Sequence, residues 1–97
     1  MIYDLDESHN PVPTTDFKCF NKNHVVKKEL VGSSEVSTVF LCIDHNYGRI
    51  GPPLLFETMV FGPLDPENEI QERCSTWDEA LEQHQRIVDK LSVASAE

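Results

Sequence analysis

Two apolar runs, Val36–Ile43 (VSTVFLCI) and Leu54–Phe61 (LLFETMVF), decide the fold of this chain. Both runs are rich in β-branched and aromatic residues and are short, which favours strands over helices. From Val39 onward the first run is apolar at successive positions, as in a strand that is covered on both faces. A ten-residue loop with two glycines and two prolines, Asp44–Pro53, separates the runs. We therefore expect two central strands of an antiparallel sheet.

An edge strand and a helix complete the predicted domain. Residues 24–31 alternate weakly and carry lysines, which is typical of an edge strand. Thr76 and Glu79 have the spacing of a capping box in front of an amphipathic helix at about 77–92. The apolar stripe of that helix consists of Trp77, Ala80, Leu81, His84, Ile87, Val88 and Leu91. The predicted fold class is α+β, with a three- to four-stranded antiparallel sheet (about 24–31, 36–43 and 54–61) packed against the C-terminal helix.

The charged face of the predicted helix carries Glu82 and Arg86 at the i, i+4 separation, so we expect them to pair. Residues 62–75 are polar and contain prolines, and the sequence predicts no regular element there. We expect one domain over 1–97, with a frayed end at about 94–97.

The N-terminal region is predicted to be an extended arm over about 1–15, because prolines restrict its backbone. One short helical turn over 16–23 would then point Phe17 and Phe20 inward. A three-stranded sheet with one helix leaves one face uncovered, although its strands are apolar on both faces. Either the N-terminal region or a second subunit must cover that face, so a homodimer is an alternative to a monomer.

Charge and composition exclude several classes of protein. The chain has 17 acidic and 8 basic residues among 97, a formal net charge of −9. Such a surface repels phosphate backbones and anionic lipids, so we expect neither nucleic acid nor a membrane as partner. Its three cysteines lie far apart and contain no C-x-x-C, unlike a disulfide framework or a zinc knuckle. We therefore expect a cytoplasmic protein without a metal or cofactor.

Four side chains are candidates for chemistry. Asp44 and His45 follow a strand, where they would bind a metal or orient an imidazole for proton transfer, although an Asx-rich turn is the simpler interpretation. Glu57 lies on an apolar strand face, where it is a candidate acid, base or ligand anchor. The alternative is that this face is partly exposed, or that Glu57 pairs with Lys27, Lys28 or Arg49. His84 interrupts the helix stripe and is more often a satisfied core residue than a ligand.

A hairpin about the central loop would place Phe40 opposite Glu57 and Ile43 near Leu54. His45 would then lie roughly 10–13 Å from Glu57, at about 3.3 Å per residue. A contact between Glu57 and His84 is easier to build, and would pair two polar groups in one core.

Protein binding is predicted for an acidic band beside the helix N-terminus, together with Tyr47 in the central loop. The band comprises Asp65, Glu67, Glu69, Glu72, Asp78, Glu79 and Glu82. The alternative is an ordinary solvated surface whose acids stabilise the helix N-terminus. No phosphate-binding glycine loop, nucleophile elbow or H-E-x-x-H motif is present in the sequence, so an enzyme is not favoured.

Three runs resemble a family of small uncharacterised proteins encoded by tailed bacteriophages and prophages. They are Ser37–Leu41 leading into Asp44–Gly48, Pro53–Gly62, and Ser75–Ala80 with His84. The likeness spans about residues 36–84, and this chain differs from it by having Cys42, Pro63 and Cys74 where glycine, glycine and an aromatic residue are expected. The resemblance implies a phage context, hence the host cytoplasm, and implies no mechanism.

The sequence favours a small acidic phage accessory protein that acts by protein–protein binding, for example by modulating or inhibiting a host protein. The first alternative is a small-molecule or metal site, with or without enzymatic activity, built from Asp44, His45, Glu57 and His84. The second alternative is a minor component of the virion or of its assembly.

Overall fold

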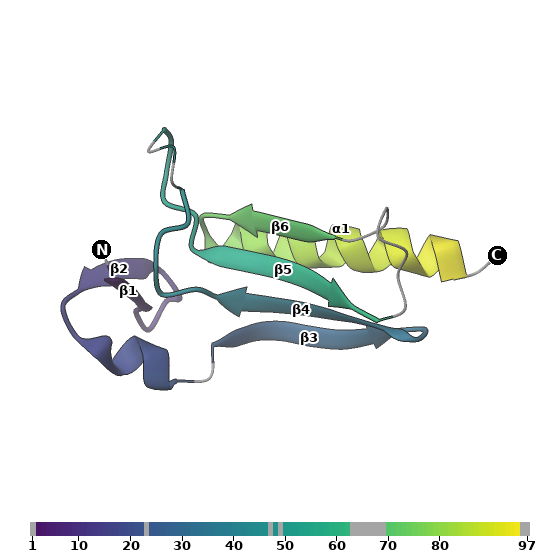
Figure 1. Cartoon of the computed structure of the whole chain (residues 1–97), viewed down its shortest axis with the longest axis horizontal. Coiled ribbons are helices and arrows are strands. Elements are labelled where there is room, and N and C mark those ends of the chain that lie inside the picture. The colour runs from purple at the N-terminus through teal and green to yellow at the C-terminus, as the bar shows by residue number, and fades with distance from the viewer. Residues whose placement is uncertain (1, 23, 47, 49, 63–69, 96–97) are drawn as a thin grey trace.

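The computed structural model describes residues 2–22, 24–46, 48, 50–62 and 70–95 (Figure 1). It has the predicted α+β architecture, with a four-stranded antiparallel sheet in the order β3-β4-β5-β6. The strands are β3 (Val25–Val31), β4 (Ser34–Phe40), β5 (Phe56–Phe61) and β6 (Gln71–Cys74). Helix α1 (Trp77–Ser95) runs along one face of this sheet (Figure 1). Each strand therefore pairs with its neighbour in the sequence.

The register of the central hairpin differs by one residue from the prediction. Phe40 pairs with Phe56, and Val39 rather than Phe40 lies opposite Glu57. β4 ends at Phe40, because Cys42 has a φ of 65° and breaks the extended backbone. The apolar residues that follow continue as loop, where Leu41 N–H donates to the Leu55 carbonyl.

Strand β6 was not predicted, because it lies within the polar stretch 62–75. Its four residues, Gln-Glu-Arg-Cys, pair with β5 through registers such as Glu57 with Arg73 and Thr58 with Glu72. The opposite charges of Glu57 and Arg73 stabilise the pairing of the two strands, although apolar residues do not alternate along β6. A strand of this kind has no signature in the hydrophobic pattern.

Helix α1 begins as predicted, since the Thr76 hydroxyl accepts a hydrogen bond from Glu79 N–H at 3.1 Å. Its buried side chains are Ala80, Gln83, His84, Ile87 and Val88. The predicted stripe is wrong at Leu81, which is 37% exposed, while Gln83 takes the inward position instead. The predicted pairing of Glu82 with Arg86 is also wrong, because Arg86 pairs with Glu72 on β6 at 2.7 Å.

The predicted N-terminal arm is a hairpin of β1 (Ile2–Leu5) and β2 (Pro11–Thr14), followed by the 3-10 helix η1 (Phe17–Asn21). This unit lies at the end of the four-stranded sheet and not across its face (Figure 1). Within η1 the prediction for Phe17 and Phe20 is wrong: both are exposed, and Cys19 is the buried residue. A ring stack between His9 and Trp77, with centroids 3.9 Å apart, joins the hairpin to the start of α1.

The core between sheet and helix has two apolar clusters and a polar centre. The first cluster contains Cys19, Phe40, Cys42, Leu55, Phe56 and Ala80. The second contains Val36, Val60, Ile87 and Val88. Between them lie the buried side chains of Thr38, Thr58, Gln83 and His84.

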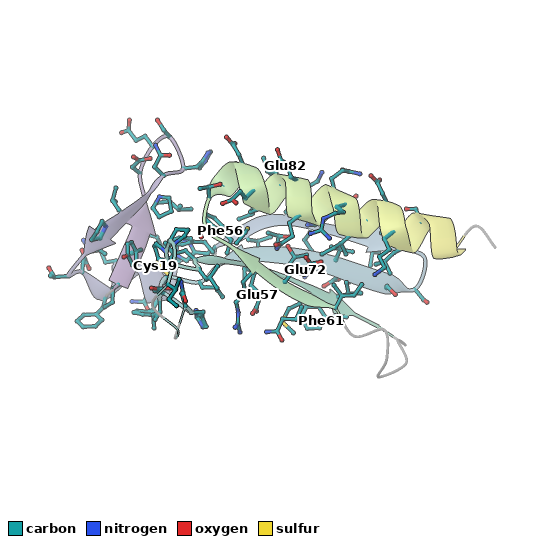
Figure 2. The ribbon with its side chains drawn as sticks, turned by 90° about the horizontal axis from the view of Figure 1, so that it is seen from above. Cys19, Phe56, Glu57, Phe61, Glu72 and Glu82 are labelled. Atoms are coloured by element: carbon teal, nitrogen blue, oxygen red, sulfur yellow. A yellow bond between two sulfur atoms is a disulfide. The ribbon has the colours of Figure 1, made fainter. Side chains whose placement is uncertain are left out.

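The opposite face of the sheet is uncovered by any described element. Across β3, β4 and β5, the row Leu30–Glu35–Phe61 and the row Lys28–Ser37–Met59 point away from α1, as alternation along each strand requires. Figure 2 shows Glu57 and Phe61 on this side, with Glu82 on the outer side of the helix. We call this surface the open face.

Candidate functional site

Asp44 and His45, the candidate residues of the central loop, make hydrogen bonds that stabilise the loop itself. Asp44 accepts hydrogen bonds from the backbone N–H groups of Asn46 (2.7 Å) and Leu54 (2.8 Å). The bond from Asn46 is the largest of the effects that lower the pKa of the Asp44 carboxyl. Asn46 donates to the Ile50 carbonyl at 2.6 Å, and His45 Nδ1 lies 2.8 Å from the Ile43 carbonyl. These contacts build an Asx-type turn, the simpler of the two interpretations.

Glu57 is buried, and its described partners are neither Lys27 nor Lys28; Arg49 lies outside the described residues. Its carboxylate accepts from Arg73 Nε at 2.9 Å and from Gln71 Nε2 at 2.7 Å, both on β6. The partner was hidden from sequence reasoning because β6 itself was not predicted. The pair lies on the open face, where it fixes the register of β5 against β6.

His84 is a satisfied core histidine, as expected. Its Nε2 lies 2.8 Å from Glu29 Oε1, and its Nδ1 lies 2.7 Å from Thr38 Oγ1. The expected contact between Glu57 and His84 is wrong. Glu57 lies opposite Val39 and points to the open face, whereas the neighbouring residue Thr38 points to the helix. The sheet backbone therefore separates Glu57 from His84.

Three acids of the predicted band, Glu72, Glu79 and Glu82, line an open groove of about 470 Å³ between β6 and α1. Its lining also includes Arg86. Arg86 donates two hydrogen bonds to the Glu72 carboxylate, which hold the pKa of Glu72 below its ordinary value. The groove is thus partly neutralised. Asp65, Glu67, Glu69 and Tyr47 lie outside the described residues.

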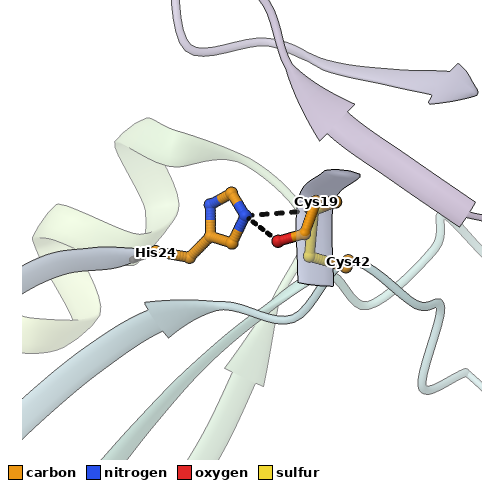
Figure 3. Close-up of side chains that lie close together, drawn as sticks. All are labelled: Cys19, His24 and Cys42. Carbon is orange, nitrogen blue, oxygen red and sulfur yellow. Dashed lines mark hydrogen bonds between the residues drawn. A yellow bond between two sulfur atoms is a disulfide. The ribbon is translucent and has the colours of Figure 1, made fainter. Parts of the chain in front are cut away.

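Cys19 and Cys42 form a disulfide bond, contrary to the expectation of unpaired cysteines (Figure 3). The bond joins η1 to the loop after β4 across 23 residues, and both cysteines are buried. His24 lies beside it, with Nε2 3.1 Å from Cys19 Sγ and 2.6 Å from the Cys19 carbonyl. No spacing motif in the sequence predicts this cluster, because the folded hairpin unit brings its members together.

The open face is the second feature that sequence reasoning left undefined. Leu30 is 73% exposed and Phe61 is 51% exposed, and both flank Glu35 in one row of the sheet. Lys28 pairs with Glu35 on the same surface at 3.3 Å. These two apolar side chains and the ion pair between them are the candidate contact surface of this face.

In comparisons with known proteins, no family model matches this chain, and no match was found among curated proteins or solved structures. Among the described residues, no helix is both long enough and apolar enough to cross a bilayer.

Proposed function

We propose that this chain is a non-enzymatic protein-binding module that contacts a protein partner through its open face. The observation that carries the proposal is the row Leu30–Glu35–Phe61, in which two large apolar side chains are exposed on either side of a compensated charge. Burying about 100 Å² of apolar surface contributes roughly 2.5 kcal/mol. Two such side chains at the centre of a contact suit the role of anchors.

The charges of the molecule favour a basic partner. On the open face Lys28 offsets Glu35 and Arg73 offsets Glu57, so the surface itself is nearly neutral. The chain as a whole has a formal charge of −9, which accelerates encounter with a positively charged protein. A partner with a basic rim around an apolar centre therefore fits both properties.

The resemblance to phage-encoded proteins supports a host protein as the partner, with modulation or inhibition as the outcome of binding. Contact through a preformed sheet face needs no catalytic residues. It agrees with the loop and core roles found for Asp44 and His84.

The proposal is tested by affinity capture from host cells, followed by binding measurements with the purified partner. We expect Leu30→Ser and Phe61→Ser each to weaken binding by about tenfold or more, as truncation of an anchor does. Leu81→Ser, which changes an apolar residue on the helix side, serves as the matched control and should leave binding unchanged.

Two results would contradict this function. The first is a partner that binds the wild type and both open-face variants equally. The second is a concentration-dependent dimer of the wild type that Phe61→Ser abolishes, because a second copy would then occupy the open face. Light scattering of both proteins across a range of concentrations separates a dimer from a monomer.

A further inference from the structure

Three potential metal ligands meet where the N-terminal unit joins the sheet. Cys19 comes from η1, His24 precedes β3, and Cys42 follows β4. One ligand atom from each, namely the two Sγ atoms and an imidazole nitrogen, lies within 4.8 Å of the others (Figure 3). Both cysteines are buried, while His24 is partly exposed and leaves the cluster a side open to solvent.

The three ligand atoms are of the kinds that bind zinc in proteins. Two thiolates and one imidazole are soft to borderline ligands, which Zn²⁺ prefers over the carboxylates that bind Mg²⁺ or Ca²⁺. With Zn–S distances of about 2.3 Å, a tetrahedral ion holds its two sulfurs about 3.8 Å apart. The Cα atoms of Cys19 and Cys42 are 6.1 Å apart, so rotation of the two side chains after reduction of the disulfide brings the sulfurs to this spacing.

The backbone conformation of Cys42 indicates independently that its sulfur has a bonding role. Its φ of 65° lies in the left-handed region, which costs an L-residue with a Cβ atom about 1–2 kcal/mol. Glycine would relieve this cost, yet a cysteine occupies the position and is turned into the cluster with Cys19. The side chain therefore contributes something that glycine does not.

We propose that the reduced form of this chain binds one Zn²⁺ ion through Cys19, His24 and Cys42, with water as the fourth ligand. The ion replaces the disulfide as the cross-link between η1 and the end of β4. In an oxidising compartment the disulfide makes this connection, and in a reducing cytoplasm, where disulfides do not persist, zinc makes it.

A dithiol reductant converts the disulfide form into the form that binds zinc. Two electrons and two protons pass from the dithiol to the Cys19–Cys42 bond, which becomes two thiols while the dithiol becomes a disulfide. Zn²⁺ then binds the two thiolates and releases their two protons to solvent. His24 Nε2–H donates to the Cys19 carbonyl in the disulfide form, so the hydrogen must move to Nδ1 before Nε2 can bind zinc.

The test uses the full chain carrying Cys74→Ser, which leaves Cys19 and Cys42 as its two thiols. The protein is reduced with a phosphine, loaded with Zn²⁺ and desalted. Mass spectrometry should find one zinc per chain, and zinc should protect both thiols from alkylation. Co²⁺ in place of zinc should give the intense near-ultraviolet absorption of a thiolate–cobalt bond.

Matched variants assign the ligands. His24→Asn should weaken zinc binding at least tenfold, since even the loss of a group behind a ligand costs 10–100-fold. His45→Asn removes the loop histidine and should change nothing. The proposal is overturned if the reduced chain retains no zinc after desalting, if zinc does not slow alkylation, or if His45→Asn weakens binding as much as His24→Asn. Circular dichroism of each reduced variant reports whether it is folded, and the alkylation assay on the Cys74→Ser chain decides the question without any variant of the ligands.

Discussion

Glu29 on β3 accepts a hydrogen bond from the buried ring of His84 on α1, with 2.8 Å between Oε1 and Nε2. A carboxylate only accepts, so Nε2 carries a hydrogen, and in the neutral ring Nδ1 then accepts from Thr38. Thr58 then donates to Thr38, and Gln83 donates to Thr58. The four bonds form one directed chain that runs from Gln83 on the helix through Thr58 and Thr38 to His84, and ends at Glu29 on the sheet.

Thr38→Val should destabilise the domain by about 1–3 kcal/mol, because it leaves His84 Nδ1 without its donor and Thr58 without its acceptor. Urea denaturation followed by tryptophan fluorescence measures the change. The exposed Thr15 provides a control, since Thr15→Val should shift the midpoint very little. A Thr38→Val protein as stable as the wild type would show that the chain of hydrogen bonds does not contribute.

Thr76→Ala should cost about 0.5–2 kcal/mol, because the Thr76 hydroxyl caps α1 by accepting from Glu79 N–H. The same denaturation assay applies, with helical circular dichroism as a second signal. Ser92→Ala, in the exposed last turns of the helix, should be neutral or slightly stabilising. Equal effects of both substitutions would argue against the cap.

Glu72→Gln should lower stability at pH 7 by up to about 1 kcal/mol, a small amount because both partners of the Glu72–Arg86 pair are more than a third exposed. The hydrogen bonds from Arg86 hold the pKa of Glu72 below its ordinary value. The contribution is therefore complete above the ordinary pKa and disappears as the pH falls through the lowered one. Wild type and variant should converge in acid. Glu82→Gln, at the partner position that sequence spacing favours, should have no comparable effect.

Cys74 should be a poor nucleophile. Burial, aided by the charges of Glu79 and Glu72, raises the pKa of its thiol to about 11. Its alkylation rate should keep rising with pH beyond 9.5, where an ordinary thiol with a pKa near 8.5 has reached its plateau. Glu79→Gln should shift this profile to lower pH, and Glu7→Gln should not. A plateau near pH 9 would contradict the burial of the sulfur.

Much of the fold follows from local pattern. The central strands and the capped helix were predicted because their apolar residues repeat at the periods of strand and helix. β6 was missed because its polar residues are held by ion pairs, Arg73 with Glu57 across the strands and Glu72 with Arg86 on the helix. The inward position of Gln83 was missed because its partner, Thr58, makes that part of the core polar. Which polar residues form a strand or point inward depends on the side chains of the element that faces them.

The candidate sites were less predictable than the fold. Buried His84 and the turn role of Asp44 could be weighed from neighbouring residues. The Cys19–His24–Cys42 cluster could not, because its ligands come from three elements joined only after the N-terminal hairpin folds against the end of the sheet. The exposure of Leu30 likewise depends on where that hairpin lies.

The neighbour-to-neighbour strand order has a consequence for the time course of folding. Within the sheet, every strand pairs with the next strand along the chain, so the hairpins β3-β4 and β5-β6 close loops of short or moderate length. The contact of Glu29 with His84 spans 55 residues, far more than the connection within either hairpin. Because loop closure costs more entropy as length grows, we expect the sheet to form the folding nucleus and the β3–α1 contact to form after the rate-limiting step. Substitution of Glu29 should then accelerate unfolding while leaving the refolding rate nearly unchanged.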